Sequence, residues 1–78
     1  MPAATIPLTS ASQLGEAIRR VRKQSGLTQR EAAALCNVSL PFLNQVEQGK
    51  PTAQIGKVLA VCGRFGIGFH LTLPAVPM

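Results

Sequence analysis

The sequence has no tryptophan, tyrosine or aspartate, and only three phenylalanines among its 78 residues. A core must therefore be built from aliphatic side chains, which suits packed helices in one small domain. The lack of an aromatic stacking platform argues against RNA as the ligand. No apolar run approaches the ~20 residues of a membrane span, and residues 1–12 lack the basic and apolar segments of a signal peptide. We therefore expect a cytoplasmic protein with no membrane partner.

Groups able to do catalysis or bind metal are scarce. His70 is the only histidine, and Cys36 and Cys62 both fall inside apolar helical patterns, which indicates free, buried thiols in a reducing compartment. Nucleophilic catalysis would need a base beside a thiol, and these three residues lack the close spacing of zinc ligands. We expect no enzyme, no catalytic residue, no metal site and no cofactor.

The charge balance is strongly basic. Eight lysines and arginines against three glutamates give a formal net charge of +5. A compact basic domain attracts nucleic acid, because binding releases counterions from the phosphates. The charge could equally serve only to keep the protein soluble, so composition alone leaves a protein-interaction module as an alternative.

Helical periodicity begins at residue 10, after a small, proline-containing segment (residues 1–9) that we interpret as a flexible arm. Ser10 and Ser12 are both plausible N-caps for the first helix. Apolar residues then recur at intervals of three and four, and Gly26 closes the helix. The stripe consists of Leu14, Ala17, Ile18 and Val21.

Two short helices follow, separated by a three-residue turn. Thr28 and Glu31 have the spacing of a capping box, which predicts the start of the second helix. Asn37 tolerates a left-handed backbone, so a tight turn is expected there. Ser39 is a natural N-cap for the third helix, which Gly49 ends.

The end of the chain changes period. An apolar helical stripe from Ile55 to Phe65 predicts a fourth helix, which starts from Thr52 and which Gly66 stops. Residues 67–73 instead alternate between apolar and polar side chains, as a strand with one buried face does. The apolar face consists of Ile67, Phe69, Leu71 and Leu73. Residues 74–78 form a short tail.

The two short helices in a basic helical domain predict a helix-turn-helix within residues 10–66. Ala33 is small enough for a close crossing, and Leu43 and Val46 would face inward on the third helix. The opposite face of that helix would then be free to contact a ligand. It presents Leu40, Pro41, Asn44, Gln45 and Gln48.

The run GLTQREAAALCNVSLPFLNQVEQGKPT resembles the Xre family of bacterial and phage repressors, over roughly residues 13–65. The resemblance implies a mainly α fold, a compact, lambda-repressor-like domain of four to five helices. Its specific features are the TQ pair that opens one helix and the E-x-G-K that closes the next. The sequence departs from the family at Asn37, where glycine is usual, and at Leu40 and Pro41, where polar base readers are common.

The resemblance also implies roles in binding double-stranded DNA. Gln29, at a helix N-terminus, would bond a phosphate, and Asn44 and Gln45 would suit the N6/N7 edge of adenine. The alternative is that these amides are ordinary solvated groups. The full DNA-binding set is Gln29, Arg30 and Lys50 for phosphates, Ser39 for phosphate or base, Leu40 and Pro41 for thymine methyls, and Asn44 and Gln45.

The family resemblance further pairs Glu47 with Arg22. We interpret this pair as structural, an ion pair that clamps the first helix to the recognition helix. Phe42 is interpreted as a packing residue, and the arginines of the first helix as a solvated face.

The predicted strand has no partner strand in its own chain. An unpaired apolar strand invites another chain, and the simplest donor is the same strand of a second copy in a homodimer. Such a dimer would place two recognition helices on a palindromic operator, with half-sites ~34 Å apart. The alternative is a segment that folds back on its own helices.

A short Xre domain that ends in one strand resembles the HipB-type antitoxins. That resemblance rests on domain size, the opening LGEAIRRVRK and the terminal GIGFHLTL. It implies a repressor of its own operon that also holds a HipA-like kinase toxin inactive. A stand-alone Xre-family or phage-type repressor, or an antitoxin of another toxin family, stays open as an alternative.

Overall fold

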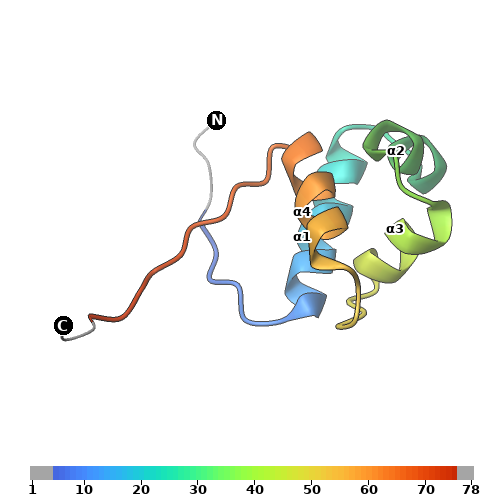
Figure 1. Cartoon of the computed structure of the whole chain (residues 1–78). Helices are drawn as coiled ribbons and strands as arrows, with labels where there is room; N and C mark the ends of the chain where they lie inside the picture. The colour runs from blue at the N-terminus through green and yellow to red at the C-terminus, as the bar shows by residue number, and fades with distance from the viewer. Residues whose placement is uncertain (1–4, 76–78) are drawn as a thin grey trace.

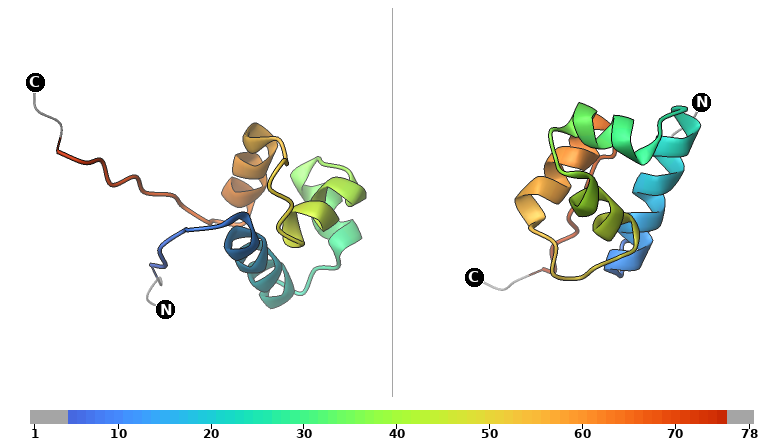
Figure 2. Two further views of the ribbon diagram at one scale, coloured as in Figure 1. Left: turned by 90° about the horizontal axis from the view of Figure 1, so that it is seen from below. Right: turned by 90° about the vertical axis from the view of Figure 1, so that its right-hand side faces the viewer.

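The computed structural model describes residues 5–75 and contains four helices in that range. They are α1 (Ala11–Gln24), α2 (Gln29–Cys36), α3 (Leu40–Glu47) and α4 (Ile55–Arg64). Figure 2 (right) shows α3 lying between α1 and α4, with α2 crossing at one end. The predicted mainly α, helix-turn-helix architecture is therefore confirmed, with four helices. None of the helices described is both long and apolar enough to cross a membrane.

The helix starts follow from their capping residues. The Ser10 hydroxyl accepts a hydrogen bond from the Gln13 N–H at 3.1 Å, so Ser10 rather than Ser12 caps α1. Thr28 and Glu31 form the predicted capping box at α2, with bonds of 2.9 and 3.1 Å. Hydrogen bonds from Thr28 lower the pKa of the Glu31 carboxyl, and the largest contribution comes from the backbone N–H of Thr28. Ser39 caps α3 by accepting from the backbone N–H of Phe42.

The turn between α2 and α3 has the predicted left-handed residue. Asn37 adopts φ 57° and ψ 44°, and its N–H bonds back to carbonyl oxygens of the last turn of α2. This conformation reverses the chain within three residues, so α3 packs directly on α2.

The core lies where the four helices meet. Its largest fully buried side chains are Ile18 from α1, Leu43 from α3, and Val61 and Cys62 from α4. The other buried apolar members are Ala32, Ala33, Cys36, Val46 and Val58. Ala33 is 3% exposed, as the predicted close helix crossing requires.

A second close approach joins α1 to α3. Gly15 is buried in the middle of α1, and a Cβ atom there would collide with the backbone carbonyl oxygens of Val46 and Glu47. Glycine normally weakens a helix interior. Here it allows the backbone of α1 to lie against the end of α3, which fixes the position of α3.

The start of α4 differs from the prediction. The helix begins at Ile55, with Gln54 as its N-cap, and not from Thr52. Residues 51–53 instead form a turn that lets the Ala53 side chain pack against the core. The apolar stripe predicted the helix but not its first residues, because Ala53 packs inward from a turn.

The segment after α4 is not part of any strand within residues 5–75. Ile67 packs against the core, but beyond it Leu71 and Leu73 are 88% and 78% exposed. Figure 1 shows the segment leaving the helices, so it does not fold back on them. The paired strand predicted for residues 67–73 needs a partner strand, which residues 5–75 do not supply. The predicted arm and tail extend past the described residues at 1–4 and 76–78.

Candidate nucleic-acid interface

Helix α3, the predicted recognition helix, has one buried and one open side. Leu43 and Val46 are buried, as predicted. Gln45 and Pro41 are exposed, and Leu40 and Asn44 are half-buried. The outer side of α3 is therefore available to a ligand over its whole length.

The N-terminus of α2 lies beside this open side. Gln29 is the first residue of the helix and is half-buried, whereas Arg30 is exposed. The first N–H groups of a helix have no intrahelical acceptor and lie at the positive end of its dipole. A phosphate placed here would meet backbone N–H donors, and Arg30 is the exposed cation that follows Gln29 in the chain.

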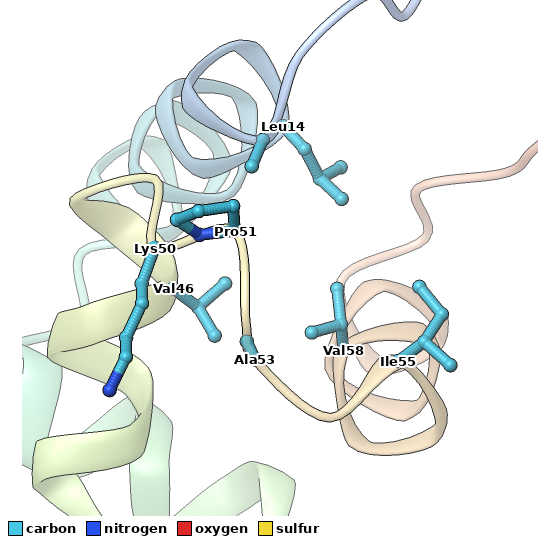
Figure 3. Close-up of a pocket in the computed structure, with 8 residues that line it drawn as sticks. Leu14, Val46, Lys50, Pro51, Ala53, Ile55 and Val58 are labelled. Carbon is cyan, nitrogen blue, oxygen red and sulfur yellow. The ribbon is translucent and has the colours of Figure 1, made fainter.

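The other end of the interface carries Lys50, just past α3. Its ammonium donates to the side-chain oxygen of Gln45 at 3.3 Å, and both residues are exposed. In Figure 3 the Lys50 side chain extends along α3, and its nitrogen points away from the neighbouring apolar side chains. A predicted phosphate contact and a predicted base contact are thus already adjacent in the free protein.

Ser39 and Phe42 complete this side of α3. The Ser39 oxygen accepts the capping bond, which leaves its O–H free to donate to a phosphate or base. Phe42 packs against the core and carries the Lys57 ammonium over its ring, 5.7 Å from the centroid. Its packing agrees with the role expected from the sequence.

The buried ion pair is formed as the sequence resemblance implied. Arg22 donates through Nε and Nη2 to the two carboxylate oxygens of Glu47, at 2.6 and 2.9 Å. Its Nη1 also donates to the Leu27 carbonyl oxygen at 2.9 Å. The side chains are only 9% and 2% exposed. The hydrogen bond to Glu47 raises the pKa of Arg22 against the opposing effect of burial, with help from the attraction of the carboxylate charge.

Two predicted DNA contacts are linked to this pair. Gln29 Nε2 donates to Glu47 Oε1 at 3.0 Å, and Asn44 Nδ2 donates to Gln29 Oε1 at 3.2 Å. Sequence reasoning treated Gln29 and Asn44 as separate contacts. The sequence feature that could have predicted the link is the i, i+3 spacing of Asn44 and Glu47, which places both residues on one face of the helix.

A polar hollow surrounds this network between α1, α2 and α3. Sequence reasoning assigned Arg19 to a solvated arginine cluster, but the fold brings it to the same hollow as Gln29 and Asn44. The lining residues are Glu16, Arg19, Arg22, Gln29, Asn44, Glu47 and Gln48. Arg19 is thus an additional exposed cation near the predicted contacts, which periodicity alone gave no reason to single out.

An apolar hollow of about 90 Å³ lies between α1, the end of α3 and α4, next to Lys50 (Figure 3). Leu14, Val46, Ala53 and Val58 line it, with the Ile55 side chain at its edge on α4. Ile55 is 65% exposed. This side of the domain leaves apolar surface in contact with water.

The two buried thiols, Cys36 and Cys62, are unreactive at neutral pH. Burial raises the pKa of the Cys62 thiol to about 11, with a further contribution from the neighbouring Cys36. Burial also raises the pKa of Cys36, partly offset by Arg64. Both thiols stay protonated at neutral pH and are poor nucleophiles. Among residues 5–75, no three His, Cys, Asp or Glu side chains gather as a metal site would require.

Comparison with known proteins agrees with this geometry. The family described as a helix-turn-helix domain matches residues 13–70. An HTH-type transcriptional regulator of Sinorhizobium fredii, y4mF, is 40% identical over 67 residues, covering 86% of this chain and 88% of the relative. The HTH-type transcriptional regulator DdrOP3 of Deinococcus deserti is 27% identical over 64 residues, 82% of this chain but only 50% of the relative.

Solved structures show the same fold. A complex of a HipB variant with an O2 20mer superposes with a TM-score of 0.79 at 19% identity, covering 92% of this chain and all of that one. A HipA-HipB-O2-O3 complex gives a TM-score of 0.78 at 20% identity, covering 91% of this chain and all of the matched chain. The chain therefore belongs to the helix-turn-helix domain family, as its resemblance to the Xre family predicted, and is a DNA-binding transcriptional regulator with the fold of HipB.

Proposed function

We propose that the protein is a sequence-specific repressor that inserts the outer side of α3 into the major groove of its operator. The observation that carries this proposal is the two-sided character of α3. Leu43 and Val46 hold its inner side in the core, while Gln45 and Pro41 stay exposed on its outer side. A groove-reading helix needs this combination of a fixed inner side and an open outer side.

The flanking residues fit the sides of the groove. Gln29 and Arg30 would contact phosphates at one end of the interface, and Lys50 would contact a phosphate at the other. Ser39, Leu40 and Pro41 occupy the start of α3, where a hydroxyl can bond phosphate or base and apolar atoms can meet thymine methyls. Gln45 supplies an exposed amide for adenine, and its oxygen accepts from the Lys50 ammonium in the unbound protein.

Selection from a randomised duplex library, followed by affinity measurements over a series of salt concentrations, tests this function. Sequence-specific binding should emerge, and the logarithm of affinity should fall linearly with the logarithm of salt concentration, by ~0.9 per neutralised phosphate. A chain that enriches no sequence and binds duplexes without salt dependence would instead be a protein-interaction module.

We also propose that the operator is palindromic and the repressor a homodimer. The segment after α4 carries Leu71 and Leu73, which are 88% and 78% exposed, and Phe69, which is 41% exposed. Ile55 and Leu59 on α4 are also exposed. An antiparallel ribbon of two copies of residues 67–73 would pair the open backbone groups and cover much of this apolar surface.

Light scattering on tail variants tests the dimer. Deletion of residues 67–78, or the pair Leu71→Ser and Leu73→Ser, should give a monomer. The matched control is the pair His70→Ser and Thr72→Ser, on the opposite side of the same strand, which should stay dimeric. A dimer that survives the deletion would show that the ribbon is not the interface.

A further proposal is that the protein acts in the cytoplasm as the antitoxin of a toxin–antitoxin module and neutralises a HipA-like kinase. It is supported by the likeness to HipB, which occurs in a HipA-HipB-O2-O3 complex. Co-purification with a kinase-like protein encoded next to this chain would support the role. Operator binding without such a partner would favour a stand-alone Xre-family or phage-type repressor, and a partner of another kind would indicate another toxin family.

A further inference from the structure

We infer that Glu47, acting through Gln29, fixes the direction of the Asn44 amide so that Asn44 recognises an adenine in the operator. This inference rests on the proposed DNA-binding function. It assigns Gln29 and Glu47 as positioning residues for base recognition, in addition to the structural part of Glu47 in its ion pair.

Three side chains from two helices carry the argument. Asn44 on α3 donates to Gln29 at the start of α2, and Gln29 donates to Glu47, one turn after Asn44 on α3. The Glu47 oxygen that accepts from Gln29, Oε1, also accepts from Arg22 Nη2 at 2.9 Å. The chain of hydrogen bonds therefore runs from the half-buried Asn44 to a carboxylate held rigidly in the interior.

The chemistry of these groups allows the hydrogen bonds from Asn44 to Gln29 and from Gln29 to Glu47 to run in one direction only, from donor to acceptor. An ionised carboxylate is an acceptor only, so Gln29 must direct its NH2 group towards Glu47. If the Gln29 amide flipped, its oxygen would face the Glu47 oxygen at about the 3.0 Å now spanned by the hydrogen bond. Because the Gln29 oxygen is directed away from Glu47, it needs a donor, and Asn44 must direct its own NH2 group towards it.

The result is a defined set of free groups on Asn44. One N–H is used by Gln29, which leaves one N–H donor and the Oδ1 acceptor for a ligand. In the major groove, adenine presents an N7 acceptor beside an N6 donor, the complement of this pair. A flipped or rotating amide would present these groups in the wrong order and would discriminate poorly.

Base discrimination at single operator positions tests the inference. Operators are first selected from a randomised duplex library with the wild-type protein, and affinities are then compared between each selected base pair and its substitutes. The variants are Asn44→Ala, Gln29→Met and the double variant, with Gln24→Met as the matched control. Gln24 is the exposed last residue of α1. Thermal melting by circular dichroism establishes that each variant is folded.

At one A·T position, Asn44→Ala should lower discrimination by roughly 5- to 140-fold, the range of one bidentate base contact. Gln29→Met should lower discrimination at that same position by roughly 5-fold or more and should add nothing in the Asn44→Ala background. Loss of a phosphate contact alone would lower the affinity for all sequences equally and leave the discrimination between base pairs unchanged. Gln24→Met should behave as wild type.

Two failures can be told apart. If the wild-type protein selects no sequence, the proposed function itself fails. If it selects an operator but Gln29→Met keeps full discrimination, or Asn44→Ala loses none at any position, then the function stands and the positioning chain is wrong.

Discussion

Replacing Glu47 with alanine should destabilise the domain severely. The substitution removes the acceptors of three hydrogen bonds, two from Arg22 and one from Gln29. It leaves the Arg22 guanidinium, whose side chain is 9% exposed, with the Leu27 carbonyl as its one remaining partner in residues 5–75. An uncompensated buried charge of this kind typically costs about 3 to 5 kcal/mol.

That cost is large for so small a chain. At about 0.05 to 0.15 kcal/mol per residue, a chain of 78 residues has a free energy of unfolding of roughly 4 to 12 kcal/mol. The melting temperature of a domain of this size falls by roughly 4 to 8 °C for each kcal/mol lost, so a fall of about 12 °C or more is expected. At the lower end of the stability range, a loss of about 5 kcal/mol would leave most Glu47→Ala molecules unfolded.

Urea denaturation followed by far-ultraviolet circular dichroism measures the effect, since a chain without tryptophan or tyrosine gives little fluorescence signal. The control is the double variant Arg22→Met with Glu47→Leu. It removes both charges and should be neutral or more stable by ~1 to 4 kcal/mol. If Glu47→Ala cost less than about 1 kcal/mol, the pair would contribute no more than a surface salt bridge, and the reasoning would be refuted.

The packing, the turn and the buried thiols give three further predictions. Gly15→Ala should push α1 away from α3 and lower the free energy of unfolding, measured by urea denaturation, by ~1 to 3 kcal/mol. The control Gly63→Ala, whose added Cβ meets nothing within 4 Å, should be neutral or stabilising. Equal effects of the two variants would contradict the close approach of α1 to α3. Asn37→Ala should cost ~1 to 2 kcal/mol at its left-handed position, and Asn37→Gly should cost nothing; a harmless alanine would argue against the turn. The pKa of the Cys62 thiol is raised to about 11 in the folded protein, so the stability that comes from keeping this thiol protonated should be complete below the unfolded pKa of ~8.5 and be lost as the pH rises towards 11. Urea denaturation at several pH values checks this. Cys62→Ala should reduce the fall of the free energy of unfolding with pH.

Local signals predicted the helix-turn-helix well because they act over three or four residues. The cap at Ser39, the capping box at Thr28 and the left-handed turn at Asn37 each depend only on side chains and backbone groups within four residues of one another. The inward residues of α3 followed from helical period alone. No tertiary contact in the described residues overrides these local preferences.

Features that depend on two distant elements were harder to predict. In the sequence, Gly15 is a residue that destabilises a helix interior. Its presence is explained only by the backbone carbonyl oxygens of α3, which leave no space for a Cβ atom at this position. The bond from Asn44 to Gln29 joins residues 15 apart in the chain. The late start of α4 reflects the inward packing of Ala53. The strand proposed for residues 67–73 would need a second chain, so the single chain described neither forms it nor excludes it.

The most direct test of α3 as the reading helix compares Gln45→Ala with Lys50→Ala. Both residues are exposed, and they touch each other at one end of the interface, so the two variants differ mainly in the chemistry removed. Gln45→Ala should relax base preference at one operator position, by ~1 to 3 kcal/mol. Lys50→Ala should weaken all sequences alike and reduce the salt slope by ~1. Two variants that both leave affinity and base preference unchanged would contradict the placement of this face of α3 on DNA.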